Sequence, residues 1–377
     1  MIRVGIDGRE LAVGVRTGIG RYLIEVLRAA SQREMECIVY GDLHTRLPIA
    51  LPKVTLETIA SHWTQWWDQV SLPLQLARDR ISVFLSPYYK GPLYPPCPVV
   101  LSIHDLYFIQ YPRKRWPAYG ALTTRLARLY ASRAAAIIAD SEYSKRSIVE
   151  RLGVSPGKVT VIPVALGPEF KPEPLTESVV TRYGIVPPYI LYVGNFRPHK
   201  NLSRLIQAYS NLSTSFRDIY QLVLAGYDRE NEQELGELVR ALGLAKRVLF
   251  TGPIEDEHLP SLYSGCELFV LPSIEEGFGL PALEAMACGA PVAVANRAAI
   301  PEEVGDAAIL FDPENVAAIT EAMNRILSRC ELRDALRQKG LVRAREFTPD
   351  RTSGRVLALL RDVSEANVRL DRSLKGC

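Results

Sequence analysis

Short apolar runs alternate with amphipathic segments along the whole chain. In the first half, these runs are separated by segments in which apolar residues recur every three or four positions. Strand patterns fall at 2–7, 37–40, 82–85, 99–103, 136–139 and 159–162, and helical patterns fall at 22–30, 69–79, 119–132 and 144–151. Strands that alternate with helices form βαβ units, so this order predicts a mainly parallel, doubly wound sheet.

The second half repeats this alternation. Strand patterns fall at 189–194, 221–225, 248–250, 267–271, 291–294 and 308–311, and helical patterns at 202–211, 230–242, 259–264 and 282–287. Residues 163–188 are rich in proline, which is typical of an interdomain linker. We therefore predict an α/β protein with Rossmann-like domains at 1–175 and 176–350. A C-terminal helical segment, 351–377, is expected to pack back on the first domain.

Length and composition agree with two domains. The chain has 377 residues, and its hydrophobic content of 47% is enough to form two cores. Its apolar stretches fall short of the ~18–20 residues that a membrane helix needs. The first residues lead directly into a strand pattern, which predicts no signal peptide. The six cysteines have no regular spacing, which predicts reduced thiols, a cytoplasmic protein and no structural metal site.

Positive charge is concentrated in the first half. Residues 1–175 contain 22 Lys and Arg against 15 Asp and Glu (+7), and residues 176–377 contain 23 against 27 (−4), which together give +3. A basic domain suits an anionic partner, so a peripheral contact with the inner face of the membrane is one expectation, and scattered solvated charge is the alternative. We expect no nucleic-acid partner. The run 113–116 (RKRW) is the candidate for this contact. Trp63, Trp66 and Trp67 are expected to pack in a core or a domain interface, and a membrane-facing patch is the alternative.

The stretch 271–292, LPSIEEGFGLPALEAMACGAPV, carries the most specific candidate chemistry. It places Glu276 in a loop and Glu284 in the first turn of the predicted helix. Gly277 and Gly279 allow the backbone to approach a ligand, and the helix N-terminus attracts an anion. A nucleotide sugar presents both an anion and hydroxyl groups to such a site. The alternative is an ordinary βαβ crossover in which Glu276 is solvated and Glu284 interacts with the helix dipole.

A basic loop follows the first predicted strand of the second domain. It reads GNFRPHKN from Gly194 and contains Arg197 and Lys200. Both cations suit a diphosphate, because Arg offers a planar fork and Lys a mobile point charge. A solvated basic turn is the alternative.

In the first domain, His104 ends the segment VVLSIH, where it can hydrogen-bond a substrate hydroxyl or serve as a structural hydrogen-bonding group. Gly18 and Gly20 lie in a predicted loop before the first helix. They form a weak dinucleotide fingerprint, because Leu23 stands in the place of the third glycine. In the segment DSEYSK, beginning at Asp140, a helix cap by Ser141 or Ser144 is the favoured interpretation.

The motif E-G-F-G-L-P followed by L-E-A-M-A-C-G-x-P-V resembles the signature of retaining glycosyltransferases of family 4. The segments V-x-x-I-H-D-L, S-E-x-S-K and G-N-x-x-P-x-K-N occur in the family's order, so the resemblance covers essentially the whole chain. It implies the GT-B fold, in which two Rossmann-like domains face a central cleft. It also implies a metal-independent enzyme that transfers a hexosyl group from a nucleoside diphosphate sugar to an acceptor hydroxyl.

The resemblance implies roles for individual residues. Glu276 would accept hydrogen bonds from the sugar and Glu284 from the ribose. Arg197 and Lys200 would neutralise the leaving diphosphate, and His104 would contact the transferred sugar. The positions implied to line the donor site are Gly18, Gly20, Gly194, Ile254, Gly277, Phe278, Gly279 and Leu280.

GDP-mannose is the preferred donor, because the basic loop and the I-H-D-L context look like those of bacterial mannosyltransferases of polysaccharide assembly. A UDP- or ADP-sugar is an alternative donor. A non-catalytic nucleotide-sugar-binding subunit is the alternative function. The expected acceptor is a glycan or lipid-linked glycan on the first domain, and no cofactor is expected besides the nucleotide sugar.

Overall fold

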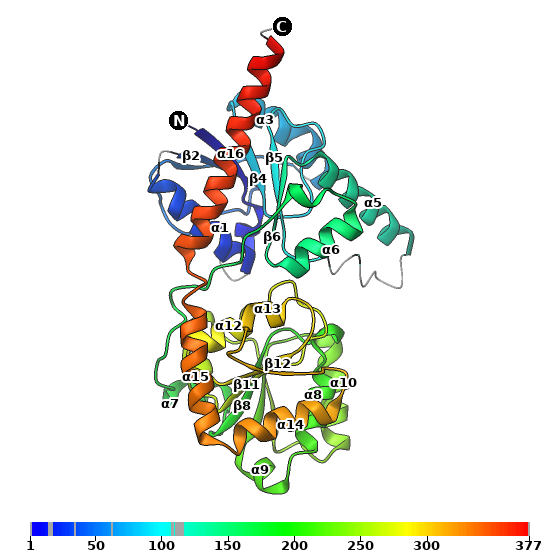
Figure 1. Cartoon of the computed structure of the whole chain (residues 1–377), viewed down its shortest axis with the longest axis vertical. Helices are drawn as coiled ribbons and strands as arrows, with labels where there is room; N and C mark the ends of the chain where they lie inside the picture. Colours follow the sequence, from blue (N-terminus) through cyan, green and yellow to red (C-terminus); the bar gives the residue numbers. More distant parts are fainter. Residues whose placement is uncertain are drawn as a thin grey trace. The chain divides into compact units, whose positions relative to one another are not determined.

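The computed structural model describes residues 2–13, 18–33, 35–61, 63–106, 109 and 117–375. The chain divides into two compact units (Figure 1). Unit 1 comprises Met1–Ala165 and Pro349–Cys377, and unit 2 comprises Leu166–Thr348. Two sequence predictions fall outside the described residues. These are the basic run 113–116 and Gly14, which the sequence pattern places in the same predicted loop as Gly18 and Gly20.

Among its described residues, unit 1 contains a seven-stranded parallel sheet in the order β3-β2-β1-β4-β5-β6-β7. The strands are β1 (Ile2–Asp7), β2 (Met35–Gly41), β3 (Val54–Thr58), β4 (Val83–Ser86), β5 (Val99–Ile103), β6 (Ala136–Ala139) and β7 (Val159–Val161). The helices are η1 (Arg9–Val13), α1 (Gly18–Ser31), α2 (Thr64–Trp66), the π-helical η2 (Trp67–Ser71), α3 (Leu72–Arg78), α5 (Pro117–Arg133), α6 (Glu142–Leu152), η3 (Pro156–Lys158) and α16 (Pro349–Lys375). The strand order reverses between β1 and β4, as in a Rossmann-like sheet.

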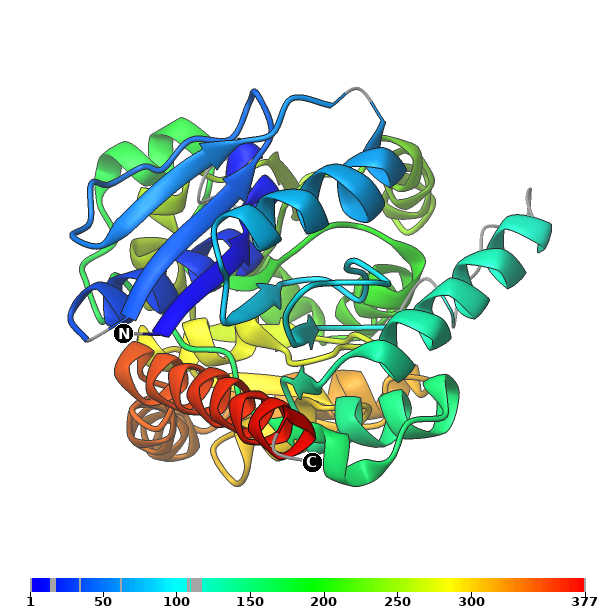
Figure 2. The same cartoon turned by 90° about the horizontal axis from the view of Figure 1, so that it is seen from above.

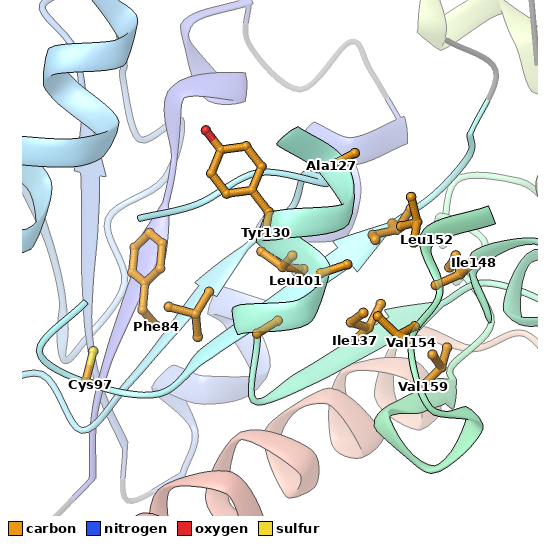
Figure 3. Close-up of a cluster of buried hydrophobic side chains, with 14 of the residues drawn as sticks. Phe84, Cys97, Leu101, Ala127, Tyr130, Ile137, Ile148, Leu152, Val154 and Val159 are labelled. Atoms are coloured by element: carbon orange, nitrogen blue, oxygen red, sulfur yellow. The ribbon is translucent and has the colours of Figure 1, made fainter. Parts of the chain in front are cut away.

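Apolar side chains cover both faces of this sheet. In β6, Ile137 and Ile138 point to opposite faces, and each joins a different buried cluster. The cluster of Ile137 includes residues of α3, α5 and α6. Figure 3 shows the residues from α5 and α6 around Ile137. The cluster of Ile138 includes residues of α1 together with Val356, Leu357 and Leu360 of α16. The C-terminal helix is therefore part of unit 1, and Figures 1 and 2 both show it beside this sheet.

Unit 2 contains a six-stranded parallel sheet in the order β10-β9-β8-β11-β12-β13. The strands are β8 (Tyr189–Val193), β9 (Gln221–Ala225), β10 (Val248–Gly252), β11 (Leu268–Leu271), β12 (Val292–Ala295) and β13 (Ile309–Phe311). The helices are α7 (Glu177–Tyr183), η4 (Pro198–Lys200), α8 (Leu202–Ser210), α9 (Thr214–Ile219), α10 (Arg229–Ala241), η5 (Asp256–His258), α11 (Leu259–Ser264), α12 (Leu280–Ala287), α13 (Ile300–Val304), α14 (Val316–Leu327) and α15 (Cys330–Ala344). Helix α8 packs on α10 and α14, and α12 packs on α11 and α15. This strand order reverses between β8 and β11.

The structure differs from the sequence prediction in the proline-rich stretch and at the first helix. Unit 2 begins at Leu166, inside the stretch predicted as a linker, because Leu166 and Phe170 are buried in unit 2 and α7 forms there. The predicted boundary at 175 therefore falls within unit 2. Gly18 and Gly20 lie in the first turn of α1, so the prediction that they belong to a loop is wrong. Gly18 is exposed, whereas Gly20 is buried in the helix.

Candidate active site

Two loops meet at the carboxyl edge of the unit 2 sheet, because the strands before them, β8 and β11, are neighbours. The strand order reverses at this point, and ligands of doubly wound sheets bind outside the carboxyl ends of the strands there. The loop after β8 carries Gly194, Arg197 and Lys200, and the side chain of Arg197 is exposed. The loop after β11 carries Glu276 and the half-buried Gly277.

An ion pair joins these two loops. Lys200 Nζ lies 2.5 Å from Glu276 Oε1, and each side chain is only 12% exposed. The neighbouring Asn201 is buried in the left-handed conformation, with φ of 61°. Its side-chain amide donates to the carbonyl oxygens of Pro272 (3.1 Å) and Pro313 (2.7 Å). Asn201 thereby fixes the loop that carries Lys200 against the loop that carries Glu276, a role that the sequence prediction missed.

Helix α12 begins directly after the Glu276 loop. Gly279 precedes its first residue, Leu280, and has φ of 79°, a backbone conformation that glycine adopts without strain. Phe278 is 6% exposed, and its ring lies edge-on against Phe347, with centroids 5.8 Å apart. The start of α12 is therefore anchored in the core of unit 2. Within the first turn, Pro281 has no N–H and the Ala282 N–H donates to the Gly279 carbonyl at 3.0 Å, so an anion would meet the N–H groups around Phe278–Leu280 and the positive end of the helix dipole.

Glu284 lies in the second turn of α12, so its predicted place in the first turn is wrong, because the helix begins at Leu280. Its side chain is buried, and Oε2 accepts a hydrogen bond of 2.9 Å from the hydroxyl of Tyr263 on α11. A buried carboxylate requires such hydrogen bonds. Tyr263 therefore helps to hold Glu284 inside unit 2. The prediction that Glu284 binds ribose stays a prediction.

Glycines end three adjacent strands of unit 2. Gly194, Gly226 and Gly252 follow or end β8, β9 and β10, and the Gly226 N–H donates to the Gly252 carbonyl at 3.0 Å. A Cβ atom on Gly226 would lie 1.8 Å from the Gly194 carbonyl oxygen. The backbones of these strand ends thus approach one another more closely than side chains would allow. Ile254 lies just beyond β10 and is half-buried.

In unit 1, His104 follows β5 and Asp140 follows β6. These strands are neighbours, and Ile103 pairs with Ala139 in their register. Nδ1 of His104 lies 2.8 Å and 3.1 Å from the two carboxylate oxygens of the buried Asp140. Its Nε2 is also buried and has no hydrogen-bond partner among the described residues. The ring of Tyr22 meets the imidazole edge-on, with centroids 5.5 Å apart.

Opposing effects act on the pKa of His104. Burial alone would lower this pKa, because it disfavours the charged imidazolium. The charge and hydrogen bond of Asp140, with further contributions from Asp105 and Glu10, outweigh burial and raise the pKa above its ordinary value. His104 therefore stays positively charged to a higher pH than an ordinary histidine.

The sequence prediction treated the segment of Asp140 as a helix cap. Ser141 does cap α6, since its side chain accepts a hydrogen bond of 3.0 Å from the Ser144 N–H. The contact between Asp140 and His104 was missed. One signal was available, because each residue stands directly after the last residue of an apolar strand pattern.

The tryptophan cluster divides into buried and exposed residues. Trp67 is 2% exposed, and the Arg9 guanidinium lies 3.7 Å from the centroid of its ring, so Trp67 packs as predicted. Trp63 and Trp66 are 74% and 56% exposed, so the packing prediction is wrong for these two. Adjacent helical residues point about 100° apart, so Trp66 cannot share the inward direction of Trp67.

Three potential metal ligands gather in the described part of unit 2. Candidate ligand atoms of Glu255, Glu257 and His258 all lie within 4.8 Å of one another. Two of these side chains already have partners, because Glu255 pairs with Arg182 and His258 Nδ1 lies 2.9 Å from the Tyr183 hydroxyl.

Comparison with known proteins defines the class of this fold. Over 97% of this chain and 100% of the other, the structure resembles sucrose-phosphate synthase from Thermosynechococcus elongatus, with a TM-score of 0.78 and 19% sequence identity. Two Rossmann-like units with parallel sheets are the architecture of GT-B glycosyltransferases.

Family models and similar proteins of known function show to which family of glycosyltransferases the chain belongs. The model for glycosyl transferases group 1 matches residues 185–343, and the model for Glycosyltransferase Family 4 matches residues 16–170. The chain belongs to glycosyltransferase family 4. It is 34% identical to O-antigen chain mannosyltransferase B of Escherichia coli over 56% of each chain. It is also 34% identical to serotype-specific mannosyltransferase WbdA of Escherichia coli over 57% of this chain and 27% of that protein. The matches thus span about half or less of these relatives.

Proposed function

We propose that this protein is a retaining glycosyltransferase that moves a hexosyl group from a nucleoside diphosphate sugar to an acceptor hydroxyl. The observation that carries the proposal is the ion pair of Lys200 and Glu276 at the point where the unit 2 sheet reverses its strand order. This pair supports the proposal, because a cation that can bind a diphosphate lies beside a carboxylate that can accept hydrogen bonds from sugar hydroxyls. Membership of glycosyltransferase family 4 supports the same reaction class.

The proposed reaction breaks the bond between the anomeric carbon and the diphosphate oxygen. A new bond to the acceptor oxygen forms on the same face of the sugar, and the acceptor proton passes to the leaving diphosphate. Lys200 and Arg197, with the backbone N–H groups at the start of α12, would stabilise the charge that builds on the diphosphate. In the donor complex, Lys200 exchanges its contact with Glu276 for a phosphate oxygen, and Glu276 then accepts hydrogen bonds from the sugar.

Mannose is the proposed sugar, because both relatives described above are named as mannosyltransferases. A hollow of about 450 Å³ beside β10 and α10 supports guanine as the base. Its lining includes the rings of Tyr227 and Phe250, which can stack on a base, and the side chain of Glu232. Glu232 Oε2 is buried and has no hydrogen-bond partner among the described residues. A carboxylate can accept hydrogen bonds from both N1–H and the 2-amino group of guanine, a pair of donors that uracil and adenine lack.

We also propose that unit 1 contacts an anionic membrane surface where it meets a glycan or lipid-linked acceptor. In the described residues, no helix is both long and apolar enough to cross a bilayer. The exposed rings of Trp63 and Trp66 favour a peripheral contact instead, because tryptophan is enriched at the interface between lipid and water.

Thermal-shift titration with GDP, UDP and ADP in the presence of EDTA tests the proposed donor. A ligand that binds only the native state raises the melting temperature, so GDP should stabilise the protein most. Stabilisation by UDP or ADP alone would contradict the assignment of guanine as the base of the donor, but it would still support a donor site. If none of the three nucleotides shifts the melt or gives heat in calorimetry, the donor site itself is wrong.

A non-catalytic sugar-nucleotide binder is the rival function. It would show the same stabilisation by GDP but no turnover of a GDP-sugar. Comparison of wild type with Glu276→Ala separates the two functions, because the enzyme should lose turnover and keep its fold in this variant.

A further inference from the structure

The imidazole of His104 has one nitrogen engaged and one nitrogen open. Nδ1 is held by the carboxylate of Asp140 at 2.8 Å, and Nε2, on the other side of the ring, is buried without a partner among the described residues. A buried polar atom without a hydrogen bond lowers the stability of the fold. Such an atom therefore indicates that a bound ligand supplies the missing hydrogen bond. The nearby hydroxyl of Tyr22 pairs with Ser102 Oγ at 3.1 Å, and it forms no hydrogen bond with Nε2.

The fold itself fixes the contact between Asp140 and His104. Each residue directly follows one of two paired parallel strands, so the register that aligns Ile103 with Ala139 also brings the next residues side by side. Asp140 also lies directly before Ser141, whose side chain caps α6. The pairing of β5 with β6 therefore holds the backbones of His104 and Asp140 next to each other.

We propose that Asp140 is a positioning residue that holds Nδ1–H of His104 and thereby presents Nε2–H as a hydrogen-bond donor to a hydroxyl of the bound sugar. The assignment of Nε2 to the sugar rests on the proposed function. The contact between Asp140 and His104 does not rest on it. Asp140 acts through His104 and is not itself a catalytic residue.

The charge of Asp140 decides whether Nε2 donates or accepts. With the carboxylate in place, the pKa of His104 lies above its ordinary value, so the ring keeps both N–H groups to a higher pH than an ordinary histidine. Asp105 and Glu10 are the other charged groups that raise this pKa, and Tyr22 faces the ring without charge near neutral pH. In Asp140→Asn, the amide oxygen can still accept a hydrogen bond from Nδ1–H. The variant loses the negative charge that mainly offsets the lowering of the His104 pKa by burial.

The direction of the pH effect follows from this balance. A function that needs imidazolium is present below the pKa of His104 and is lost as pH rises through it. Asp140→Asn should therefore move this loss to lower pH. Turnover that Asp140→Asn lacks near neutral pH should return as the solution is acidified, a rescue that a purely structural role of Asp140 would not produce.

Histidine-selective ¹³C labelling and NMR test the contact without any substrate. The chain has five histidines, so the His104 signal can be assigned with a His104→Gln variant, and the exposed His44 provides an internal reference that should not move. We expect Asp140→Asn to lower the titration midpoint of His104 by about one pH unit or more, as for the loss of a close opposite charge. Asp140→Glu, which retains the charge, should keep most of the wild-type midpoint.

Ser141→Ala is the matched control, because it removes the cap of α6 next to Asp140 and leaves the carboxylate in place. It should leave the His104 midpoint unchanged. An unchanged midpoint in Asp140→Asn, or an equal shift in Ser141→Ala, would overturn the positioning role. If Asp140→Asn does not fold, the titration of His104 in Asp140→Glu decides. A His104 midpoint below the ordinary histidine value in that variant would also overturn the positioning role.

Release of GDP from GDP-mannose, measured across pH for wild type and Asp140→Asn, tests the assignment of Nε2. A falling limb that moves to lower pH in the variant supports it, and an identical pH profile with a uniformly lower rate contradicts it. If wild type turns over no GDP-mannose while the NMR midpoint shifts as expected, the proposed donor fails and the contact between Asp140 and His104 stands.

Discussion

The ion pair of Lys200 and Glu276 leads to a quantitative prediction about stability. Lys200→Met keeps the length of the side chain but leaves the Glu276 carboxylate without its cation, at 12% exposure. At an effective dielectric of about 20, two unit charges ~4 Å apart attract each other by roughly 4 kcal/mol, and desolvation offsets part of this. We expect each single variant, Lys200→Met or Glu276→Gln, to lower the free energy of unfolding of unit 2 by about 2–4 kcal/mol. The double variant should lose less than the sum, with a coupling energy of about 1–3 kcal/mol.

Denaturant unfolding of the full chain, for wild type, the two single variants and the double variant, measures this double-mutant cycle. Circular dichroism follows both units, and tryptophan fluorescence serves as a reference for unit 1, because all four tryptophans belong to that unit. Lys339 and Asp306 provide a matched control within unit 2, since they also form a close ion pair, at 2.6 Å, but with largely exposed side chains. The corresponding cycle there should show a much smaller coupling. Additive effects of Lys200→Met and Glu276→Gln would refute the buried pair.

Three further predictions concern backbone packing, base recognition and the surface of unit 1. Gly226→Ala should destabilise unit 2 by about 2 kcal/mol or more, because its Cβ would lie 1.8 Å from a carbonyl oxygen, whereas Gly236→Ala inside α10 should be neutral or stabilising in the same melts. Glu232→Gln should weaken GDP binding in calorimetry about tenfold, as for the loss of a charged hydrogen bond, and leave UDP binding unchanged; equal losses for both nucleotides would contradict guanine recognition. Replacing Trp63 and Trp66 together with Ser should reduce co-flotation with anionic phosphatidylglycerol vesicles, whereas Val342→Ser, at another exposed apolar position, should not; unchanged flotation of the double variant would exclude this surface.

Strand patterns in the sequence predicted most of both sheets, because buried parallel strands read as short apolar runs. The edge strand β3 was missed, since its residues are half-buried or exposed and carry no such run. Helix α7 was missed because proline dominates the composition around it, although Thr176 caps its first turn. In these segments, tertiary packing outweighs the local composition.

The candidate site was predictable as motifs but not as contacts. Lys200 and Glu276 are 76 positions apart, and only the neighbouring positions of β8 and β11 in the sheet bring them together. The partnership of His104 with Asp140 depends in the same way on the pairing of β5 with β6. The predicted helix began two residues too late, so Glu284 lies in its second turn and not in its first. Non-local pairing and the exact start of a helix are the features that local patterns leave open.

Proton NMR of the first sugar released from GDP-α-mannose tests the central proposal most directly, with water serving as acceptor so that the natural acceptor is not needed. A retaining enzyme should release GDP together with the α-anomer of mannose before the anomers equilibrate, without added metal. Glu276→Ala should lose this release while still unfolding cooperatively, although unit 2 is less stable without the ion pair. Initial formation of the β-anomer, or equal release by wild type and Glu276→Ala, would contradict the proposed reaction and the role of this site.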